Sequence, residues 1–134
     1  MLEGQRVNPV DDITWLTSGA ADPHLASARE ALNGGRESPT PAMLERLRRE
    51  LSTERAHLVV QQVQLRHRAA RKFSLAEKMF FTPVLLEQAT SEAISRYKAT
   101  LYPQGPVADL CCGVGGDAIG LVCRGGSVLG VDRD

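Results

Sequence analysis

Two aspartates and a glycine cluster near the end of the chain have the residue types and spacing of a site for an adenosine-containing ligand. Asp109 lies in an apolar run that begins at Val107, and the glycines of GVGG at 113–116 come next. Glycine lets the backbone approach a ligand closely and adopt positive φ angles. Asp132 follows at close to the ~20-residue spacing at which a carboxylate reaches a ribose diol in nucleotide-binding folds. The pattern therefore predicts a turn around a cofactor, with a carboxylate on its ribose.

Two classes of cofactor fit this pattern, and two acidic residues distinguish them. Read as G-x-G-x-x-A, residues 113–118 form a loose dinucleotide fingerprint, with a pyrophosphate at the start of the next helix. That reading gives Asp109 no role, and it places Asp117 in the first helical turn, where its charge would repel a pyrophosphate. S-adenosylmethionine has no phosphate, and its methionine end carries an ammonium group that a nearby carboxylate stabilises. We therefore predict S-adenosylmethionine as the cofactor, with NAD in an oxidoreductase as the alternative.

The stretches VADLCCGVGGDAIGLV and VLGVDRD together resemble the first two motifs of class I S-adenosylmethionine-dependent methyltransferases. In that family an acid opens the first motif, glycines form the loop around the methyl donor, and a second acid holds the ribose. Cys111 departs from the pattern, because many members have glycine there, so the turn is expected to be slightly shifted. The donor-binding residues that the resemblance implies are Asp109 near the methionine end, Cys111, Gly113, Gly115 and Gly116 in the loop, and Asp132 on the ribose.

The segment before the first motif extends the resemblance to about residues 60 to 134. The form CGVGG and the preceding FFTP are similar to the trimethylguanosine-synthase-like branch, and to bacterial RNA methyltransferases with an N-terminal helical region. In the bacterial proteins, segments like RHRAARKF and MFFTPVLLEQAT precede the motif in this order. The resemblance implies RNA as the substrate, and it implies that a Thr-Pro segment packs over the donor, which makes Phe81 and Thr82 candidate contacts.

A local cluster of positive charge is the candidate RNA contact. Its members are Arg66, Arg68, Arg71 and Lys72, near the end of a predicted helix. Clustered cations are what phosphate contact requires, but basic residues at a helix end also interact favourably with the helix dipole. Two interpretations stay open: the cluster binds substrate RNA, or residues 1–105 form a helical module that docks RNA or protein without catalysis.

The elements that position these residues are mostly helices. Pro23, Pro41 and Pro83 each follow a residue suited to cap a helix, so each predicts a helix start. The predicted helices run from Asp22, from Thr40 with Met43, Leu44, Leu47 and Leu51 on one face, from Ser52 to Phe73, from the capping-box sequence SLAE at 74–77, and from Thr82 to Tyr102.

A change of pattern at PQGP, residues 103–106, predicts a domain boundary. An apolar strand at 107–112, a helix over about 117–123 and a strand at 127–132 fit one βαβ unit. We therefore expect a mainly α N-terminal helical domain at 1–105, followed at 106–134 by the first βαβ unit of a Rossmann-like α/β methyltransferase fold.

Composition adds few constraints on partners. Sixteen basic and sixteen acidic residues cancel, so no overall charge draws the chain to RNA, DNA or an anionic membrane. The three cysteines lack zinc-site spacing and predict reduced thiols and no metal. No apolar run approaches the ~20 residues that span a bilayer, and the N-terminus does not resemble a signal peptide. We expect a cytoplasmic protein with no membrane partner.

One motif of the family does not occur. Its catalytic tetrapeptide, Asn or Asp followed by Pro-Pro, comes after the fourth strand, and this sequence contains none. By the resemblance we expect the N-terminal part of a methyltransferase, with no catalytic residue of its own, weak or no binding of the donor, and no transfer activity in isolation. The free edges of a two-stranded sheet are expected to favour self-association.

Overall fold

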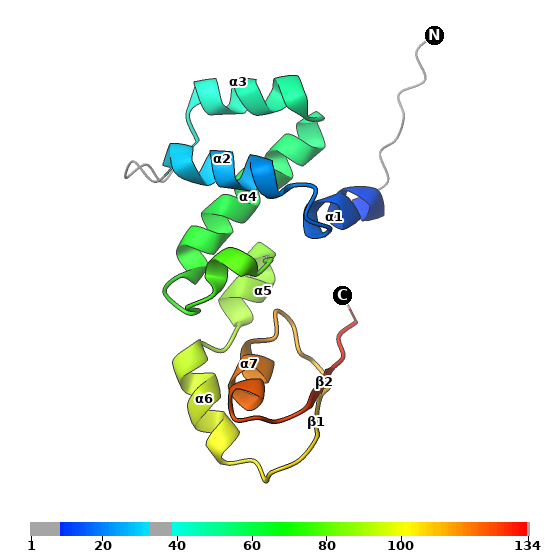
Figure 1. Ribbon diagram of the computed structural model, residues 1–134, viewed down its shortest axis with the longest axis vertical. Helices are drawn as coiled ribbons and strands as arrows, with labels where there is room; N and C mark the ends of the chain where they lie inside the picture. Colours follow the sequence, from blue (N-terminus) through cyan, green and yellow to red (C-terminus); the bar gives the residue numbers. More distant parts are fainter. Residues whose placement is uncertain (1–8, 33–38, 134) are drawn as a thin grey trace. The chain divides into compact units, whose positions relative to one another are not determined.

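The structure, a computed structural model, describes residues 9–32 and 39–133 (Figure 1). Contacts within the chain divide it into two compact units, Met1–Gln64 and Leu65–Asp134. The described residues are mainly helical, with seven α-helices, one 3-10 helix and one parallel two-stranded sheet. None of the helices in these ranges combines the length and apolar character needed to cross a bilayer.

The first unit is built from helices packed on an aliphatic core. Its elements are α1 (Pro9–Thr17), α2 (Asp22–Leu32), α3 (Pro41–Glu50) and the first part of α4 (Thr53–Ala69). The predicted start of α3 is confirmed: Thr40 Oγ1 accepts the Met43 N–H at 3.2 Å, which satisfies one of the free donors at the helix start. Leu25, Met43 and Leu47 are buried, so the apolar faces of α2 and α3 form the core of this unit.

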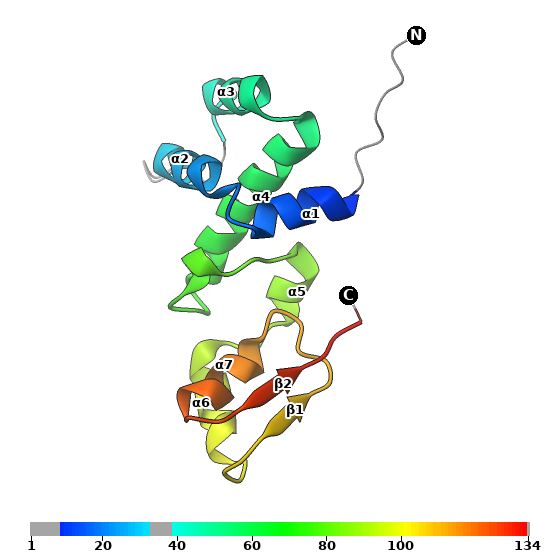
Figure 2. The ribbon, with the colours of Figure 1, turned by 45° about the vertical axis from the view of Figure 1, so that its right-hand side comes forward.

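The second unit combines the end of α4 with short helices and the sheet. The elements are the 3-10 helix η1 (Ala76–Lys78), α5 (Pro83–Gln88), α6 (Glu92–Thr100), β1 (Val107–Asp109), α7 (Gly116–Cys123) and β2 (Val128–Gly130). The strands are parallel, with Val107 opposite Val128 and Asp109 opposite Gly130, and α7 connects them. Figure 2 shows α6 and α7 on one side of the two strands. A buried cluster of Leu65, Ala69, Phe73, Ala76, Phe81 and Leu86 forms the core, and Val114 and Ile119 pack against it.

Three helix predictions in the second unit need correction. The helix expected to reach Phe73 ends at Ala69, because a tight turn, in which the Lys72 N–H bonds to the Ala69 carbonyl at 2.8 Å, directs Phe73 into the core. The capping box at Ser74 does not form, since the Ser74 N–H and hydroxyl both donate to Glu92, and only η1 follows. The helix expected over 82–102 is interrupted at 89–91, where Ala89 and Ser91 have extended backbone angles.

The sheet leaves apolar side chains exposed on its outer face. The register places Ala108 opposite Leu129, and Leu110 and Val131 come directly after the two strands. Leu110, Leu129 and Val131 are 71%, 66% and 45% exposed. Parallel sheets usually have both faces covered, whereas these side chains are exposed. Self-association through the free strand edges stays a prediction. The unit that begins at Leu65 includes residues on both sides of the predicted domain boundary at 105/106, which also stays a prediction.

Candidate functional site

The glycine turn after β1 has a backbone that requires glycine at two positions. Gly113 has φ +51° and Gly115 has φ +79°, and Gly115 caps the start of α7 in the left-handed conformation. A Cβ at Gly115 would meet no atom within 4 Å, and one at Gly113 would meet only Leu85 Cδ2 at 3.8 Å. These glycines are therefore required by the backbone conformation, and the space beside them is open.

Both predicted acids lie at this turn. Asp109 Oδ1 accepts the Cys111 N–H at 3.3 Å, and Asp132 Oδ2 accepts the Gly113 N–H at 2.7 Å. Parallel pairing explains why both acids lie at this turn, because it brings the carboxyl ends of β1 and β2 to the same edge of the sheet. The backbone bond from the Val131 N–H to the Asp109 carbonyl, at 2.8 Å, continues the ladder up to Asp132. The turn and the two carboxylates thus form one constellation.

A cavity of about 440 Å³ opens beside this constellation. Its volume falls within the range of ~300–1,000 Å³ that is typical of small-molecule sites. One wall comes from the turn, and the other comes from the end of α5 and the segment after it. The lining residues are Leu85, Gln88, Ala89, Thr90, Asp109, Leu110, Cys111, Cys112, Gly113, Val114, Gly116, Asp117, Asp132 and Arg133. Five of the predicted donor-binding residues line this cavity, namely Asp109, Cys111, Gly113, Gly116 and Asp132.

Gly116 has a second role that the sequence did not indicate. A Cβ at this position would lie 2.7 Å from the Thr90 carbonyl oxygen, closer than real Cβ atoms approach. Gly120, one turn later in α7, is likewise packed closely against Ser95. A Cβ at Gly120 would lie 2.5 Å from the Ser95 carbonyl carbon. Glycine at these two positions allows α7 to pack directly against the backbone of 90–95. This packing fixes the distance between the two walls of the cavity.

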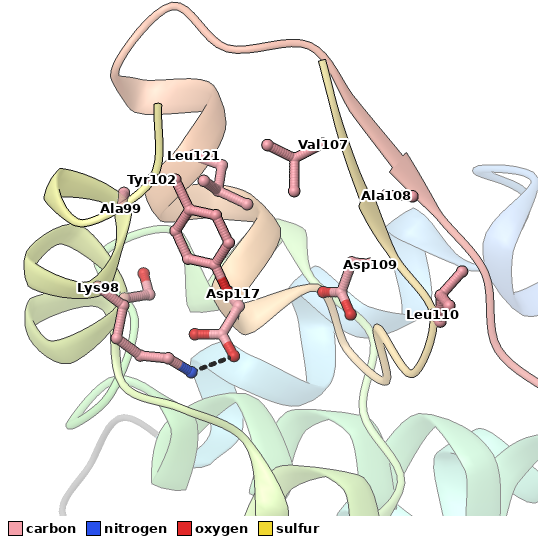
Figure 3. A pocket seen from close by; sticks show the side chains of 10 residues that line it. Lys98, Ala99, Tyr102, Val107, Ala108, Asp109, Leu110, Asp117 and Leu121 are labelled. Carbon is pink, nitrogen blue, oxygen red and sulfur yellow. Dashed lines mark hydrogen bonds and ion pairs between the residues drawn. The ribbon is translucent and has the colours of Figure 1, made fainter. Parts of the chain in front are cut away.

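A smaller cavity of about 120 Å³ lies between α6 and β1 (Figure 3). Lys98, Tyr102 and Val107 line it together with Asp109 and Asp117, which also line the larger cavity. The Lys98 ammonium lies 2.6 Å from Asp117 Oδ2, and the Thr90 hydroxyl donates to the same oxygen at 3.3 Å. Asp117 Oδ1 is buried, with no hydrogen-bond partner among the described residues.

The Lys98 ion pair changes what Asp117 contributes electrostatically. A negative charge at Asp117 would repel a pyrophosphate at the start of α7 only if no cation compensated it. Its pairing with Lys98 offsets that charge locally. Asp117 is therefore weaker evidence for S-adenosylmethionine over NAD than the sequence indicated. The preference for S-adenosylmethionine depends more on Asp109.

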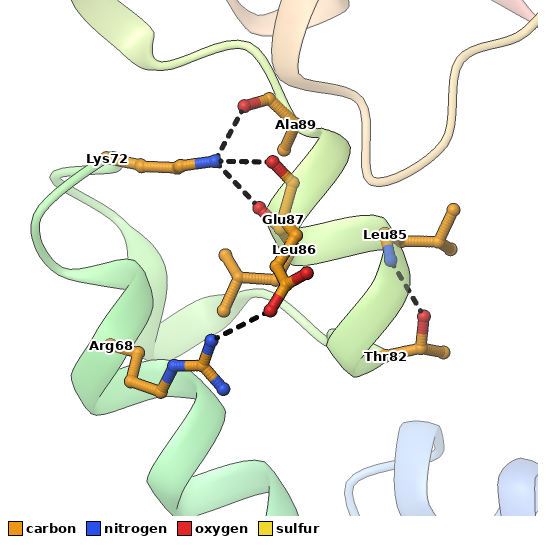
Figure 4. Close-up of polar contacts among 7 residues, drawn as sticks. All are labelled: Arg68, Lys72, Thr82, Leu85, Leu86, Glu87 and Ala89. Carbon is orange, nitrogen blue, oxygen red and sulfur yellow. Dashed lines mark hydrogen bonds and ion pairs between the residues drawn. The ribbon is translucent and has the colours of Figure 1, made fainter.

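Phe81 and Thr82, the expected contacts over the donor, have other roles. Phe81 is 3% exposed and stacks on Phe73 with ring centroids 6.0 Å apart. Thr82 Oγ1 accepts the Leu85 N–H at 3.2 Å and caps α5 (Figure 4). Neither residue is part of the wall of the larger cavity. Their contact with a donor stays a prediction, while their packing and capping roles are direct observations.

The four basic residues do not form one exposed surface. Arg66 is 8% exposed, donates to the Met79 carbonyl at 2.8 Å and lies 4.7 Å above the Phe80 ring. Lys72 donates to three backbone carbonyls of the α5 end (Figure 4). Arg68 and Arg71 are exposed, and Arg68 lies 3.5 Å from Glu87. RNA contact stays a prediction, with Arg68 and Arg71 as its accessible candidates.

Sequence reasoning did not identify the residues that form the second wall. Gln88, Ala89 and Thr90 lie inside a segment that was predicted to be continuous helix, and no motif singles them out. Lys98 also has no local signal, because its partner Asp117 belongs to a different helix.

Comparisons of the chain with protein-family models, curated proteins and solved structures found no match. Any functional proposal therefore depends on this chain's own residues and their geometry.

Proposed function

We propose that this chain carries the cofactor-binding part of a class I S-adenosylmethionine-dependent methyltransferase that acts on RNA. In this proposal β1, α7 and β2 are the first βαβ unit of a Rossmann-like fold, and the larger cavity holds the methyl donor. The observation that carries the proposal is the bond between Asp132 and the Gly113 N–H, because it ties the acid after β2 to the glycine turn, in the wall of the cavity that Asp109 also lines.

The residues of the cavity fit the groups of this donor. Asp132 suits a ribose diol, because each oxygen of a carboxylate can accept more than one hydrogen bond. Its Oδ2 accepts the Gly113 N–H at 2.7 Å, and its Oδ1 accepts the Arg133 N–H at 2.8 Å. Asp109 suits the ammonium group of the methionine end, since opposite charges attract. Gly113, which lines the cavity, leaves room for a ligand to approach the turn, because a Cβ there would meet only Leu85 Cδ2 at 3.8 Å, whereas Gly115 is not part of the cavity lining. When bound, the donor would supply a methyl group on a sulfonium, and the task of these residues would be to bind and orient it.

The proposed function predicts a preference between two adenosine-containing ligands. In isothermal titration calorimetry, the protein is expected to bind S-adenosylhomocysteine in preference to NADH. Asp132→Asn and Asp109→Asn should each weaken S-adenosylhomocysteine binding about tenfold, because each replaces a charged acceptor with a neutral amide. Asp11→Asn, an equivalent change at an exposed position on α1, should leave the affinity unchanged.

Two results would contradict the proposed function. Binding of NADH as tight as that of S-adenosylhomocysteine would favour the oxidoreductase alternative. If neither ligand binds, the cavity is not a site for an adenosine cofactor in this chain, and the alternative of a helical docking module without catalysis gains support.

RNA as the acceptor predicts a role for the exposed arginines. Replacing Arg68 and Arg71 together with alanine should weaken RNA binding and lower the slope of log K against log salt by about 1.4, at ~0.7 for each lost contact to single-stranded RNA. Arg66 is unsuitable for this test, since its burial means that truncation would perturb the fold. Fluorescence anisotropy with labelled RNA at several salt concentrations measures both quantities.

The matched control for this test removes two exposed arginines from α3, Arg48 and Arg49. If the α3 variant loses as much RNA affinity as the Arg68 and Arg71 variant, the loss reflects general charge and the assignment to α4 is wrong. A larger loss in the α3 variant would place the main RNA contact on α3 and would likewise contradict the assignment to α4.

A further inference from the structure

Lys72 holds the end of α5 through all three of its N–H donors. Its ammonium nitrogen lies 2.8 Å from the Leu86 carbonyl oxygen and 3.0 Å from those of Glu87 and Ala89 (Figure 4). The last carbonyls of a helix have no partner within the helix, and a positive charge at that end is favourable. Lys72 therefore satisfies the end of α5 from outside the helix, and an ammonium has no further donor to offer an RNA phosphate.

The start of α6 is held by the same short segment. The Glu92 N–H donates to the Lys72 carbonyl at 2.9 Å. Glu92 Oε2 accepts the Ser74 N–H at 2.8 Å and the Ser74 hydroxyl at 2.7 Å. These two bonds, together with Arg96, lower the pKa of Glu92 from 4.5 to about 2, so the carboxylate stays ionised in mildly acidic solution as well as at neutral pH. Residues 72–74 thus fix both the end of α5 and the start of α6.

The segment between these two points forms a wall of the larger cavity. Gln88, Ala89 and Thr90 line it, opposite the glycine turn. The Thr90 backbone closes on Gly116, and its hydroxyl donates to Asp117 at 3.3 Å. Lys72 itself is not part of the cavity lining. Lys72 is therefore expected to affect a ligand in the cavity indirectly, through the position of 88–90.

We infer that Lys72 is a positioning residue for the larger cavity, which sets the place of the wall 88–90 relative to the glycine turn. This inference rests on the proposed function, because it takes the cavity as the site of an adenosyl ligand. The inference also removes Lys72 from the candidate RNA contacts. The Lys72 ammonium is bonded to carbonyls at the end of α5, whereas Arg68 and Arg71 are exposed to solvent.

The test compares Lys72→Met with Arg71→Met, a matched loss of charge at the neighbouring exposed residue. Lys72→Met should weaken S-adenosylhomocysteine binding about tenfold and speed amide hydrogen exchange about tenfold in peptides that cover 85–92. Arg71→Met should change neither quantity. Affinities are measured by calorimetry at a temperature where circular dichroism shows each variant folded, so that loss of global stability does not enter.

Conservative variants separate positioning from a purely structural role. Lys72→Arg keeps a cation with several donors and should recover most of the affinity. Lys72→Gln keeps two N–H donors but no charge and should recover less, and it replaces Lys72→Met if that variant does not fold. Unchanged affinity or unchanged exchange at 85–92 in the neutral variants overturns the inference while leaving the proposed function intact. Failure of the unmodified protein to bind S-adenosylhomocysteine overturns the proposed function, and this inference with it.

Discussion

Replacing Gly120 with alanine is expected to destabilise the unit formed by Leu65–Asp134 by about 2–3 kcal/mol. An added Cβ would lie 2.5 Å from the Ser95 carbonyl carbon and 2.7 Å from its Oγ, distances that real Cβ atoms do not adopt. Because Ser95 is 1% exposed and belongs to α6, relief would require α6 and α7 to separate. Alanine has a better helix propensity than glycine, by about 1 kcal/mol. A decrease in the free energy of unfolding of Gly120→Ala would therefore show that the packing clash outweighs the gain in propensity.

The measurement is urea denaturation followed by tyrosine fluorescence. Tyr97 and Tyr102 both lie in the second unit, and Trp15, the only tryptophan of the chain, lies in the first, so the two signals can be followed separately. The urea midpoint of the tyrosine signal should fall in Gly120→Ala. Val122→Ala, on an exposed position of the same helix, should change the free energy of unfolding by no more than about 0.5 kcal/mol.

A double variant identifies the atoms responsible. If the clash involved only the serine hydroxyl, Ser95→Ala would rescue Gly120→Ala. The nearest atoms also include the Ser95 carbonyl, which no side-chain change removes, so we expect little rescue. An unchanged or higher midpoint in Gly120→Ala, or full rescue by Ser95→Ala, would contradict direct packing of α7 on the α6 backbone.

Local signals were sufficient to predict the elements around the glycine turn. The apolar runs and glycine punctuation predicted a strand, a helix and a strand, and β1, α7 and β2 occupy those positions. The location of Asp109 and Asp132 at the same turn also follows from the sequence, since parallel pairing brings the C-terminal ends of β1 and β2 to the same edge of the sheet. The glycines were only partly explained, because Gly113 and Gly115 serve the turn while Gly116 also serves helix packing.

Partners distant in the sequence were not predictable from a single chain. The break at 89–91 has no glycine or proline, and it is held by Lys72, which donates to carbonyls of an element that comes later in the chain. Spacing alone placed Arg66 with Arg68 in one basic cluster, but burial against Phe80 separates them. In each case the deciding contact is tertiary, and periodicity or capping patterns do not contain it.

The Lys98–Asp117 pair is expected to control whether the larger cavity accepts a phosphate-bearing ligand. Asp117→Asn leaves the Lys98 ammonium uncompensated beside the start of α7, where a helix also favours anions. Lys98→Met leaves the Asp117 carboxylate uncompensated at the same place. The first variant should raise the affinity for NADH relative to S-adenosylhomocysteine, and the second should lower it, because only NADH carries a pyrophosphate.

The size of the effect follows from the exposure of the pair. The side chains of Lys98 and Asp117 are 41% and 36% exposed, so solvent screens part of the charge. A unit charge about 6 Å from a phosphate, at an effective dielectric constant of about 40, contributes about 1.4 kcal/mol, or about tenfold in affinity. The ratio of the two affinities should therefore differ about a hundredfold between the two variants.

Competition calorimetry with both ligands at fixed ionic strength measures the ratio, and Lys78→Met, which removes an exposed lysine from η1, is the matched control. Raising the salt concentration should reduce both shifts, because screening weakens interactions between partly exposed charges. If the two variants shift the ratio in the same direction, they act through the packing of α6 on α7. If neither shifts it, the ligand's phosphates lie away from Asp117, and the acid in the first turn of α7 does not select between the two cofactor classes.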